Sequence, residues 1–488
     1  MMSINSKTKE KQITAYSMAF MAFSAVWGFG NVVNGYRYYG GMSVTLMWVL
    51  MFALYFVPYA LMVGELGSAF KNEGGGVSSW IDRTMGKRLA FYAGWTYWVV
   101  HIPYLSQKPT TSLVALGWII FGDGRVGSSG WKMFESGILS QIPTATIVQI
   151  LGLVVFFITV FMALRGITFL KKISSIAGTA MFVMSILFII MMIAAPGITG
   201  QVHWAQIDWS WKTFVPAFDK NSIMNIAILI FAVGGCEKLS PYVNKMNNPS
   251  KSFPKGMILL AVMVAVCAIL GTIALGLMFA GQPLDNEFVT NGQYLAFQRV
   301  GQYYGLGNSL MIIYAVCFLV VQIAVMIVSI DAPLRMLLDT ADEKYIPNWL
   351  TKTNKRGVYK NGVLVVTIAV SILIIVPALG IGSVSDIVDF VIGLNSICMP
   401  LRYLWVFAAY IALKKHTEQY PSGYHFTKSK KFGMFVGAWC LALTAFACIT
   451  KIFNVDGNYF KLTINILTPF ILLGIGLILP ATAKRTNK

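Results

Sequence analysis

Long apolar runs separated by short polar segments recur along the whole chain of 488 residues. A helix needs about 20 predominantly apolar residues to cross the hydrocarbon core of a bilayer, and about twelve runs reach that length. The pattern therefore predicts an all-α polytopic membrane protein whose single transmembrane domain takes up residues 1–488. We expect the spans at about residues 13–39, 42–70, 88–121, 144–164, 173–196, 222–245, 257–281, 305–337, 362–380, 386–413, 432–452 and 460–481.

The polar segments predict how the chain is oriented. If the N-terminus lies in the cytoplasm, most of the 38 Lys and Arg residues, Lys238 among them, fall on the cytoplasmic side, as the positive-inside rule requires. Residues 339–360 would form a basic cytoplasmic loop, and residues 286–304 are too polar to span and predict a short surface helix outside. An even number of spans places both termini in the cytoplasm of a plasma (bacterial inner) membrane.

Composition supports this class. Only 12% of the residues are charged and 57% are hydrophobic, whereas soluble domains carry about a quarter charged residues. The net charge of +19 would suggest a nucleic-acid partner in a soluble protein, but basic cytoplasmic loops account for it. We therefore expect the protein to contact the lipid bilayer and to bind no nucleic acid. The four His and six Cys residues show no metal-ligand spacing, and we expect neither metal nor cofactor.

Two glycine clusters interrupt apolar spans. Gly28 and Gly30 lie in the first expected span, and Gly234 and Gly235 lie in the sixth. Glycine costs about 1 kcal/mol in a helix interior, and unwound backbone inside a membrane is tolerated only where it is buried in protein or lines a cavity. Its N–H groups attract a carboxylate and its carbonyls attract an ammonium. An amino acid offers both groups.

The alternative is that these glycines allow close helix packing. Their position in spans one and six, five spans apart, favours broken helices at a midplane binding site. That spacing predicts a five-plus-five inverted repeat, with residues 13–196 as the first unit and 222–413 as the second. Residues 432–481 would add two further helices.

Five short motifs in the order of a known family strengthen this interpretation. They are residues 28–30 (GFG), 64–70 (GELGSAF), 231–237 (FAVGGCE), 248–254 (NPSKSFP) and 341–349 (ADEKYIPNW). Together they resemble the amino acid–polyamine–organocation (APC) superfamily, and the sequence looks closest to its glutamate:γ-aminobutyrate antiporter group. Phe29 departs from the small middle residue of the family's first break.

The resemblance implies the LeuT-like fold, alternating access, no cofactor and no catalytic residues. It implies that residues 28–30 lie at the substrate carboxylate, that Phe231 is a gate, and that residues 234–236 offer carbonyls to the amino group. Glu237 would link substrate occupancy to helix movement. The candidate site residues implied in this way are Gly28, Phe29, Gly30, Phe231, Gly234, Gly235, Cys236 and Glu237.

Ionisable side chains within spans need partners or a watery cavity. Glu237 is either part of the site or a structural hydrogen-bond acceptor. Lys108, in the middle of span three, either holds a substrate carboxylate or takes part in proton coupling, or else forms a structural ion pair. For His101 and Arg402, and for the pair Asp331–Arg335, we expect structural roles.

The function that fits best is exchange of amino acids or their amine products. A proton-coupled amino acid symporter on the same fold is the alternative, and Ser329, followed by an isoleucine, argues against a sodium site. A membrane-embedded enzyme or a channel is less consistent with two broken helices and no catalytic motif. The identity of the substrate and the oligomeric state stay open.

Overall fold

The computed structural model describes residues 13–128, 130–284, 287–340, 342–375, 392–453 and 459–486. Within these ranges the chain is helical, and strand-like pairing is limited to two isolated bridges. Among the irregular helices, η1 (Phe52–Phe56) is π-helical and η5 (Cys236–Lys245) is 3₁₀-helical. The principal α-helices are α1 (Ala15–Val26), α2 (Gly30–Tyr38), α3 (Val44–Met51), α4 (Val57–Ala69), α5 (Val77–Met85), α6 (Lys87–Phe121), α7 (Thr144–Ala163), α8 (Ile167–Ile198), α10 (Lys220–Met224), α11 (Ile226–Val233), α12 (Pro249–Phe279), α13 (Glu287–Tyr303), α14 (Ser309–Leu338), α15 (Lys360–Ile375), α17 (Leu401–Lys415), α18 (Lys430–Ile452), α19 (Tyr459–Ile475) and α20 (Ile478–Thr486).

Nine helical segments of the described residues are long and apolar enough to cross a bilayer, and a bent pair adds a tenth. The bent pair is α1 with α2, whose axes differ by 42°, so the expected break in the first span is confirmed. The nine segments are Val44–Ala69, Thr144–Ala163, Ile167–Ile198, Lys220–Lys245, Pro249–Phe279, Ser309–Leu338, Ile392–Lys415, Lys430–Ile452 and Leu462–Arg485.

Two of the twelve expected spans do not pass this test. The third corresponds to α6, which has 35 residues but is not apolar enough to be counted with the others. The ninth corresponds to α15, which has 16 residues. The remainder of that expected span, and the expected beginning of the tenth, fall in residues 376–391, outside the described ranges.

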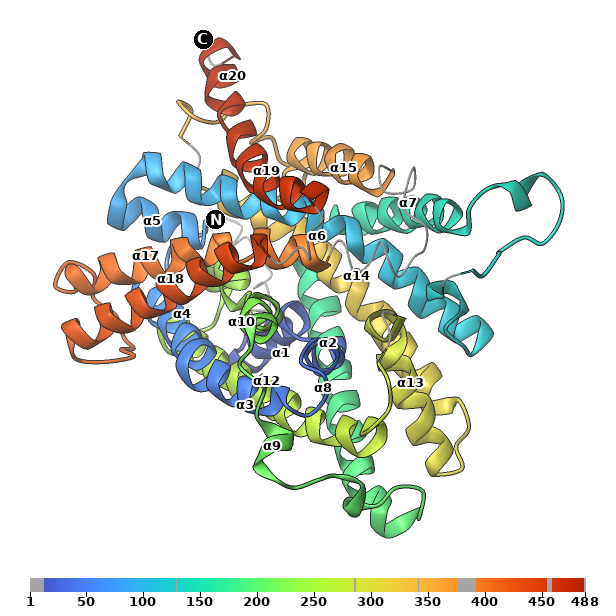
Figure 1. The fold of residues 1–488 in the computed structure, drawn as a ribbon. Helices are drawn as coiled ribbons and strands as arrows, with labels where there is room; N and C mark the ends of the chain where they lie inside the picture. Colours follow the sequence, from blue (N-terminus) through green and yellow to red (C-terminus); the bar gives the residue numbers. More distant parts are fainter. Residues whose placement is uncertain are drawn as a thin grey trace, which may run out of the picture.

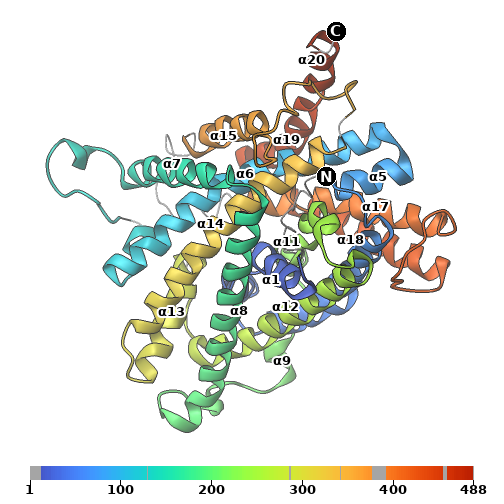
Figure 2. The ribbon, with the colours of Figure 1, turned by 180° about the vertical axis from the view of Figure 1, so that it is seen from behind.

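The broken first span lies at the centre of the molecule. Figures 1 and 2 show α1 in the middle of the bundle from both sides, and α1 contacts α8, α12, α14 and η5. The segments differ in how far they are buried within the protein. In the most apolar stretch of Lys220–Lys245, 72% is buried, whereas in that of Leu462–Arg485 only 17% is buried. The first and sixth spans are therefore internal, whereas the last span is peripheral.

A glycine sets the distance between α1 and α8. A Cβ atom at Gly178 would overlap the main-chain carbonyl oxygen of Phe20. Gly256 of α12 makes a looser but still tight approach, with 3.1 Å between an ideal Cβ and the carbonyl oxygen of Ala15. Backbone can approach backbone at these points because no side chain intervenes. The position of α1 between α8 and α12 depends on both contacts.

We expect Gly178→Ala to destabilise the protein, because the added methyl group meets main chain that can yield only if α1 and α8 separate. Overpacking of this kind typically costs about 1–3 kcal/mol. The measurement is thermal unfolding of the purified protein in detergent, followed by size exclusion. Gly197→Ala is the matched control, since this glycine lies in the same helix with nothing within 4 Å of its ideal Cβ. Equal melting temperatures for the two variants would contradict the argument.

Candidate functional site

The first break exposes backbone N–H groups in the middle of the bundle. Helix α1 ends at Val26, and Trp27 turns to an extended conformation with φ −119° and ψ 135°. The N–H groups of Gly28, Phe29 and Gly30 then donate to no backbone carbonyl of the described residues. They lie at the N-terminal end of α2, where unpaired N–H groups and the helix dipole favour an anion.

The second break exposes carbonyl groups. Helix α11 ends at Val233, and the chain turns at Gly235, whose φ of 115° lies in the left-handed region that favours glycine. Gly234 has no room for a side chain, because a Cβ there would overlap the hydroxyl of Tyr403. The last carbonyls of a helix lack intrahelical partners, so the end of α11 favours a cation.

One side chain joins the two breaks. The Nδ2 atom of Asn31 donates to the carbonyl oxygen of Ala232 over 3.0 Å and lies 3.4 Å from the carbonyl oxygen of Val26. It therefore satisfies one carbonyl at the end of α11 and one at the end of α1. No feature of the glycine pattern pointed to this residue.

A cavity lies between the breaks, with a volume of about 130 Å³. One water needs roughly 10–15 Å³ on this scale, so a small solute can be accommodated. Five of the nine expected site residues line it, namely Gly28, Gly30, Lys108, Phe231 and Gly234. The lining also includes Asn31, Tyr104, Lys238, Gln293, Tyr294, Arg402 and Tyr403.

Phe29 does not line the cavity. Its side chain is fully buried in an aromatic cluster, with ring centroids 4.7 Å from Phe188, 5.4 Å from Phe297 and 6.2 Å from Tyr314. Such edge-to-face pairs stabilise packing. The bulky residue in the glycine motif therefore anchors the break from behind, and only its backbone remains available at the site.

Gly235, Cys236 and Glu237 also lie outside the cavity lining. The Glu237 carboxylate is fully buried. It accepts a hydrogen bond from the Tyr59 hydroxyl, and its Oε1 lies 3.2 Å from Nε of Arg402. The carboxylate thus sits behind the cavity and neutralises a guanidinium that does line it.

His101 completes the surroundings of Arg402. Nδ1 of His101 lies 2.5 Å from the carbonyl oxygen of Tyr97, and Nε2 lies 2.5 Å from Nη1 of Arg402. A guanidinium only donates, so Nε2 accepts and the proton of the neutral ring resides on Nδ1. The structural role expected for His101 is to hold Arg402 in place.

Two lysines face the same aromatic ring. The ammonium of Lys108 lies 4.4 Å from the ring centroid of Tyr104, and that of Lys238 lies 4.9 Å from it. Lys238 also donates to Oγ of Ser329 over 2.6 Å. Sequence reasoning selected Lys108 but counted Lys238 with the cytoplasmic charges, although its side chain is buried at the cavity.

Helix α13 lies where the short helix of residues 286–304 was expected, but it does more than cover the surface. Gln293 and Tyr294 line the cavity, and the Tyr314 hydroxyl donates to Oε1 of Gln293 over 2.7 Å. Because the sequence of this helix is polar, it predicted a surface position and gave no sign that some of its side chains line the cavity. Within the described residues, no group of His, Cys, Asp and Glu side chains is placed to hold a metal ion.

The expected local pair near the C-terminal end of α14 is present. Nε of Arg335 lies 2.7 Å from Oδ2 of Asp331, which also accepts a hydrogen bond from the Tyr242 hydroxyl over 2.7 Å. Tyr242 belongs to η5, so this ion pair ties the segment after the second break to α14. It is separate from the cavity lining.

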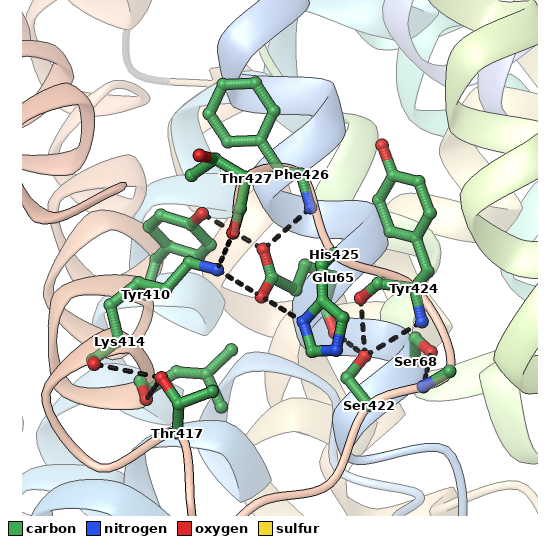
Figure 3. Close-up of polar contacts among 12 residues, drawn as sticks. Glu65, Ser68, Tyr410, Lys414, Thr417, Ser422, Tyr424, His425, Phe426 and Thr427 are labelled. Atoms are coloured by element: carbon green, nitrogen blue, oxygen red, sulfur yellow. Dashed lines mark hydrogen bonds and ion pairs between the residues drawn. The ribbon is translucent and has the colours of Figure 1, made fainter. Parts of the chain in front are cut away.

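A second polar cluster lies away from the cavity and surrounds Glu65 of α4. Figure 3 shows Tyr410, Lys414 and His425 and the main-chain N–H of Phe426 converging on its carboxylate. The distances to the Glu65 oxygens are 3.0 Å from the Tyr410 hydroxyl, 2.5 Å from Lys414 Nζ, 3.2 Å from His425 Nδ1 and 3.0 Å from the Phe426 nitrogen. Both Glu65 and Lys414 are buried. This cluster fastens α17 and the segment after it to α4.

A cavity with charged and polar lining residues between two interrupted helices of a multi-span bundle is the arrangement of a secondary transporter. The sequence profile of the family described as "Amino acid permease" matches residues 13–478. The chain belongs to this family, within the APC superfamily, and is a transporter rather than an enzyme.

Sequence identity to individual proteins refines the comparison. The aspartate/glutamate permease AcaP of Lactococcus lactis subsp. cremoris MG1363 is 47% identical over 486 residues, which cover 98% of this chain and 96% of AcaP. The inner membrane transporter YjeM of Escherichia coli K12 is 23% identical over 84% of this chain and 83% of its own length. The glutamate/γ-aminobutyrate antiporter of L. lactis IL1403 is 24% identical over 74% of this chain and 68% of its own length. The expected special closeness to that antiporter group is therefore wrong, because AcaP is far more similar.

We expect Glu65→Gln to destabilise the protein by about 3–5 kcal/mol, since it leaves the buried Lys414 ammonium without its counter-charge. The double variant Glu65→Gln/Lys414→Met should lose less than the sum of the two single variants. Glu418→Gln is the control, because Glu418 forms an exposed pair with Lys430 at 2.7 Å, and such pairs contribute at most about 1 kcal/mol. Thermal unfolding in detergent measures all four variants. Additive losses in the double variant would show that Glu65 and Lys414 do not stabilise one another.

Proposed function

We propose that this permease carries acidic amino acids, of which aspartate and glutamate are the simplest. The observation behind the proposal is the charge of the cavity. Lys108, Lys238 and Arg402 line it, no lining residue of the described chain is a carboxylate, and Glu237 offsets only Arg402. Buried charge without a partner is costly, so an anionic ligand stabilises this site more than a neutral one. The name of the 47% identical relative, an aspartate/glutamate permease, supports the same class.

The two breaks suggest how the common part of the substrate would bind. The N–H groups of Gly28, Phe29 and Gly30 would hold the α-carboxylate at the N-terminal end of α2, where they donate to no backbone carbonyl of the described residues. The carbonyls at the end of α11, next to Phe231 and Gly234, would hold the ammonium. Phe231 would close one wall as a gate.

The remaining expected residues act indirectly in this proposal. Gly235 and Cys236 shape the turn that ends α11. Glu237 is a positioning residue, because it holds the Arg402 guanidinium at the cavity while lying outside the lining itself. Movement of η5 would carry Glu237 with it, which would link occupancy of the site to rearrangement of the helices.

For the mode of transport we propose exchange by alternating access at the two broken helices. Two more distant relatives are named antiporters, one for glutamate and γ-aminobutyrate and one, described as probable, for agmatine and putrescine. Proton-coupled symport is the alternative. The Ser329 hydroxyl already accepts from Lys238, which adds to the argument against sodium at that point.

We further propose twelve spans and the inverted five-plus-five repeat of the LeuT-like fold, with units 13–196 and 222–413 and two additional helices in 432–481. Helix α6 would be the third span, since its 35 residues can cross about 50 Å. Three of its polar residues, Gln107, Lys108 and Thr111, line the cavity. The protein would lie in an inner membrane, as the name of the relative YjeM states for that protein. Both termini would lie in the cytoplasm.

The test is uptake of radiolabelled aspartate into liposomes that contain the purified protein. We expect uptake to require aspartate or glutamate inside, and to be inhibited by outside glutamate but not by lysine or agmatine. Glu418→Gln, an exposed substitution remote from the cavity, should behave as the wild type, whereas Glu237→Gln should lose most of its uptake because Arg402 loses its counter-charge.

Two outcomes would change the proposal. Uptake into empty liposomes driven by a pH gradient would replace exchange by proton symport. Transport of neutral or basic amino acids with no uptake of aspartate or glutamate would refute the acidic substrate class.

A further inference from the structure

Lys108 and Lys238 approach one another from different parts of the chain. Lys108 belongs to α6, and Lys238 follows the second break in η5. Both ammonium groups lie within 5 Å of the Tyr104 ring centroid, at 4.4 and 4.9 Å. A ring face attracts a cation, but two cations at one ring also repel each other. A negative charge placed near both ammonium groups would offset this repulsion.

No carboxylate of the described residues supplies that charge. Lys238 donates to a neutral hydroxyl, that of Ser329. The ammonium group of Lys108 makes no hydrogen bond or ion pair with a described residue and contacts the Tyr104 ring. The nearest acid in sequence, Glu237, is engaged by Arg402 and Tyr59.

The other acid of the neighbourhood is also engaged. Asp331, two residues beyond Ser329, pairs with Arg335 and accepts from Tyr242. The two ammonium groups at Tyr104 are therefore the part of the cavity lining, within the described chain, whose charge the protein leaves uncompensated. Arg402, the third cation, already has its partner.

We propose that Lys108 and Lys238, whose ammonium groups both lie at the Tyr104 ring, form a subsite for the side-chain carboxylate of the substrate, and that Lys238 determines the preference for acidic over neutral amino acids. The inference rests on the proposed function, and it adds the two residues that recognise the side chain of the substrate. The breaks bind what all amino acids share, namely the α-carboxylate and the ammonium. The two lysines bind what only acidic ones possess.

The subsite also joins the parts of the protein that flank the cavity. A carboxylate between the two ammonium groups bridges α6 to η5, and η5 begins directly after Gly235. Neutral amides such as asparagine and glutamine match the acidic substrates in size but bring no charge to this bridge. Binding of the correct side chain would draw η5 towards α6, whereas binding of an amide would leave the two lysines repelling each other.

The experiment compares aspartate with asparagine, and glutamate with glutamine, by transport in liposomes and by ligand-induced thermal stabilisation in detergent. In Lys238→Met we expect the preference for aspartate over asparagine to fall about tenfold or more, the size of one lost charge-assisted hydrogen bond. Lys238→Arg keeps the charge and should retain most of the preference. Lys352→Met, which removes an exposed lysine after α14, is the matched control and should keep the wild-type ratio.

The outcomes separate this inference from the function on which it rests. If the wild type carries no acidic amino acid, the proposed function fails. If the wild type prefers aspartate and folded Lys238→Met keeps the same aspartate-to-asparagine ratio, only the subsite is refuted. Should Lys238→Met not fold, Ser329→Ala tests the same point, because it releases the Lys238 ammonium from its hydrogen bond. A preference reduced severalfold supports the subsite, and an unchanged preference refutes it.

Discussion

The structure depends on the requirement that every polar backbone group inside a bilayer find a partner within the protein. The helical hydrogen bonding is interrupted twice, after Val26 and after Val233, and each interruption leaves backbone groups that need other partners. The broken segments lie at the centre, where neighbouring helices shield them from lipid. Asn31 satisfies a carbonyl at each break, and the groups that remain face a polar cavity. In the proposed function, a ligand with opposite charges at its two ends binds between these two breaks.

Charge at the cavity is divided between groups that are paired and groups that are not. Arg402 is held by Glu237, by neutral His101 and by the Tyr403 hydroxyl, so its charge is compensated and its direction fixed. Lys108 and Lys238 meet only a ring face and a hydroxyl among the described residues. The charged side chains at this cavity therefore differ in their surroundings, since Arg402 is paired with a carboxylate and the two lysines have no carboxylate partner among the described residues.

The sequence predicted the helical bundle, most span positions and both breaks, because apolar length and glycine position follow from local chemistry. It could not predict which way side chains face. Phe29 sits in the motif of the first break, yet its ring packs behind the cavity, since the rotation of α2 is set by Phe188 and Phe297. Lys238 was counted as a cytoplasmic charge because hydropathy records that a lysine is near a span end but not that it points inward.

Other site residues were concealed by long-range pairing. Helix α13 reads as a polar surface segment, and its contribution of Gln293 and Tyr294 depends on where it folds over the bundle. The partner of Glu237 is Arg402, which lies far along the chain in α17. Neither relation has a local signature, so both require the structure.

The cluster around Glu65 has a consequence for biosynthesis. Its carboxylate belongs to an early span, yet the Tyr410 hydroxyl lies 345 residues later in the chain and the Lys414 ammonium 349 residues later. At roughly 5–20 residues per second, a ribosome needs on the order of 20–70 s to reach them. For that time α4 carries a carboxylate whose permanent partners do not yet exist. The final packing of α4 must wait until α17 has entered the membrane, so the end of α4 that carries Glu65 is completed late in assembly although it is made early.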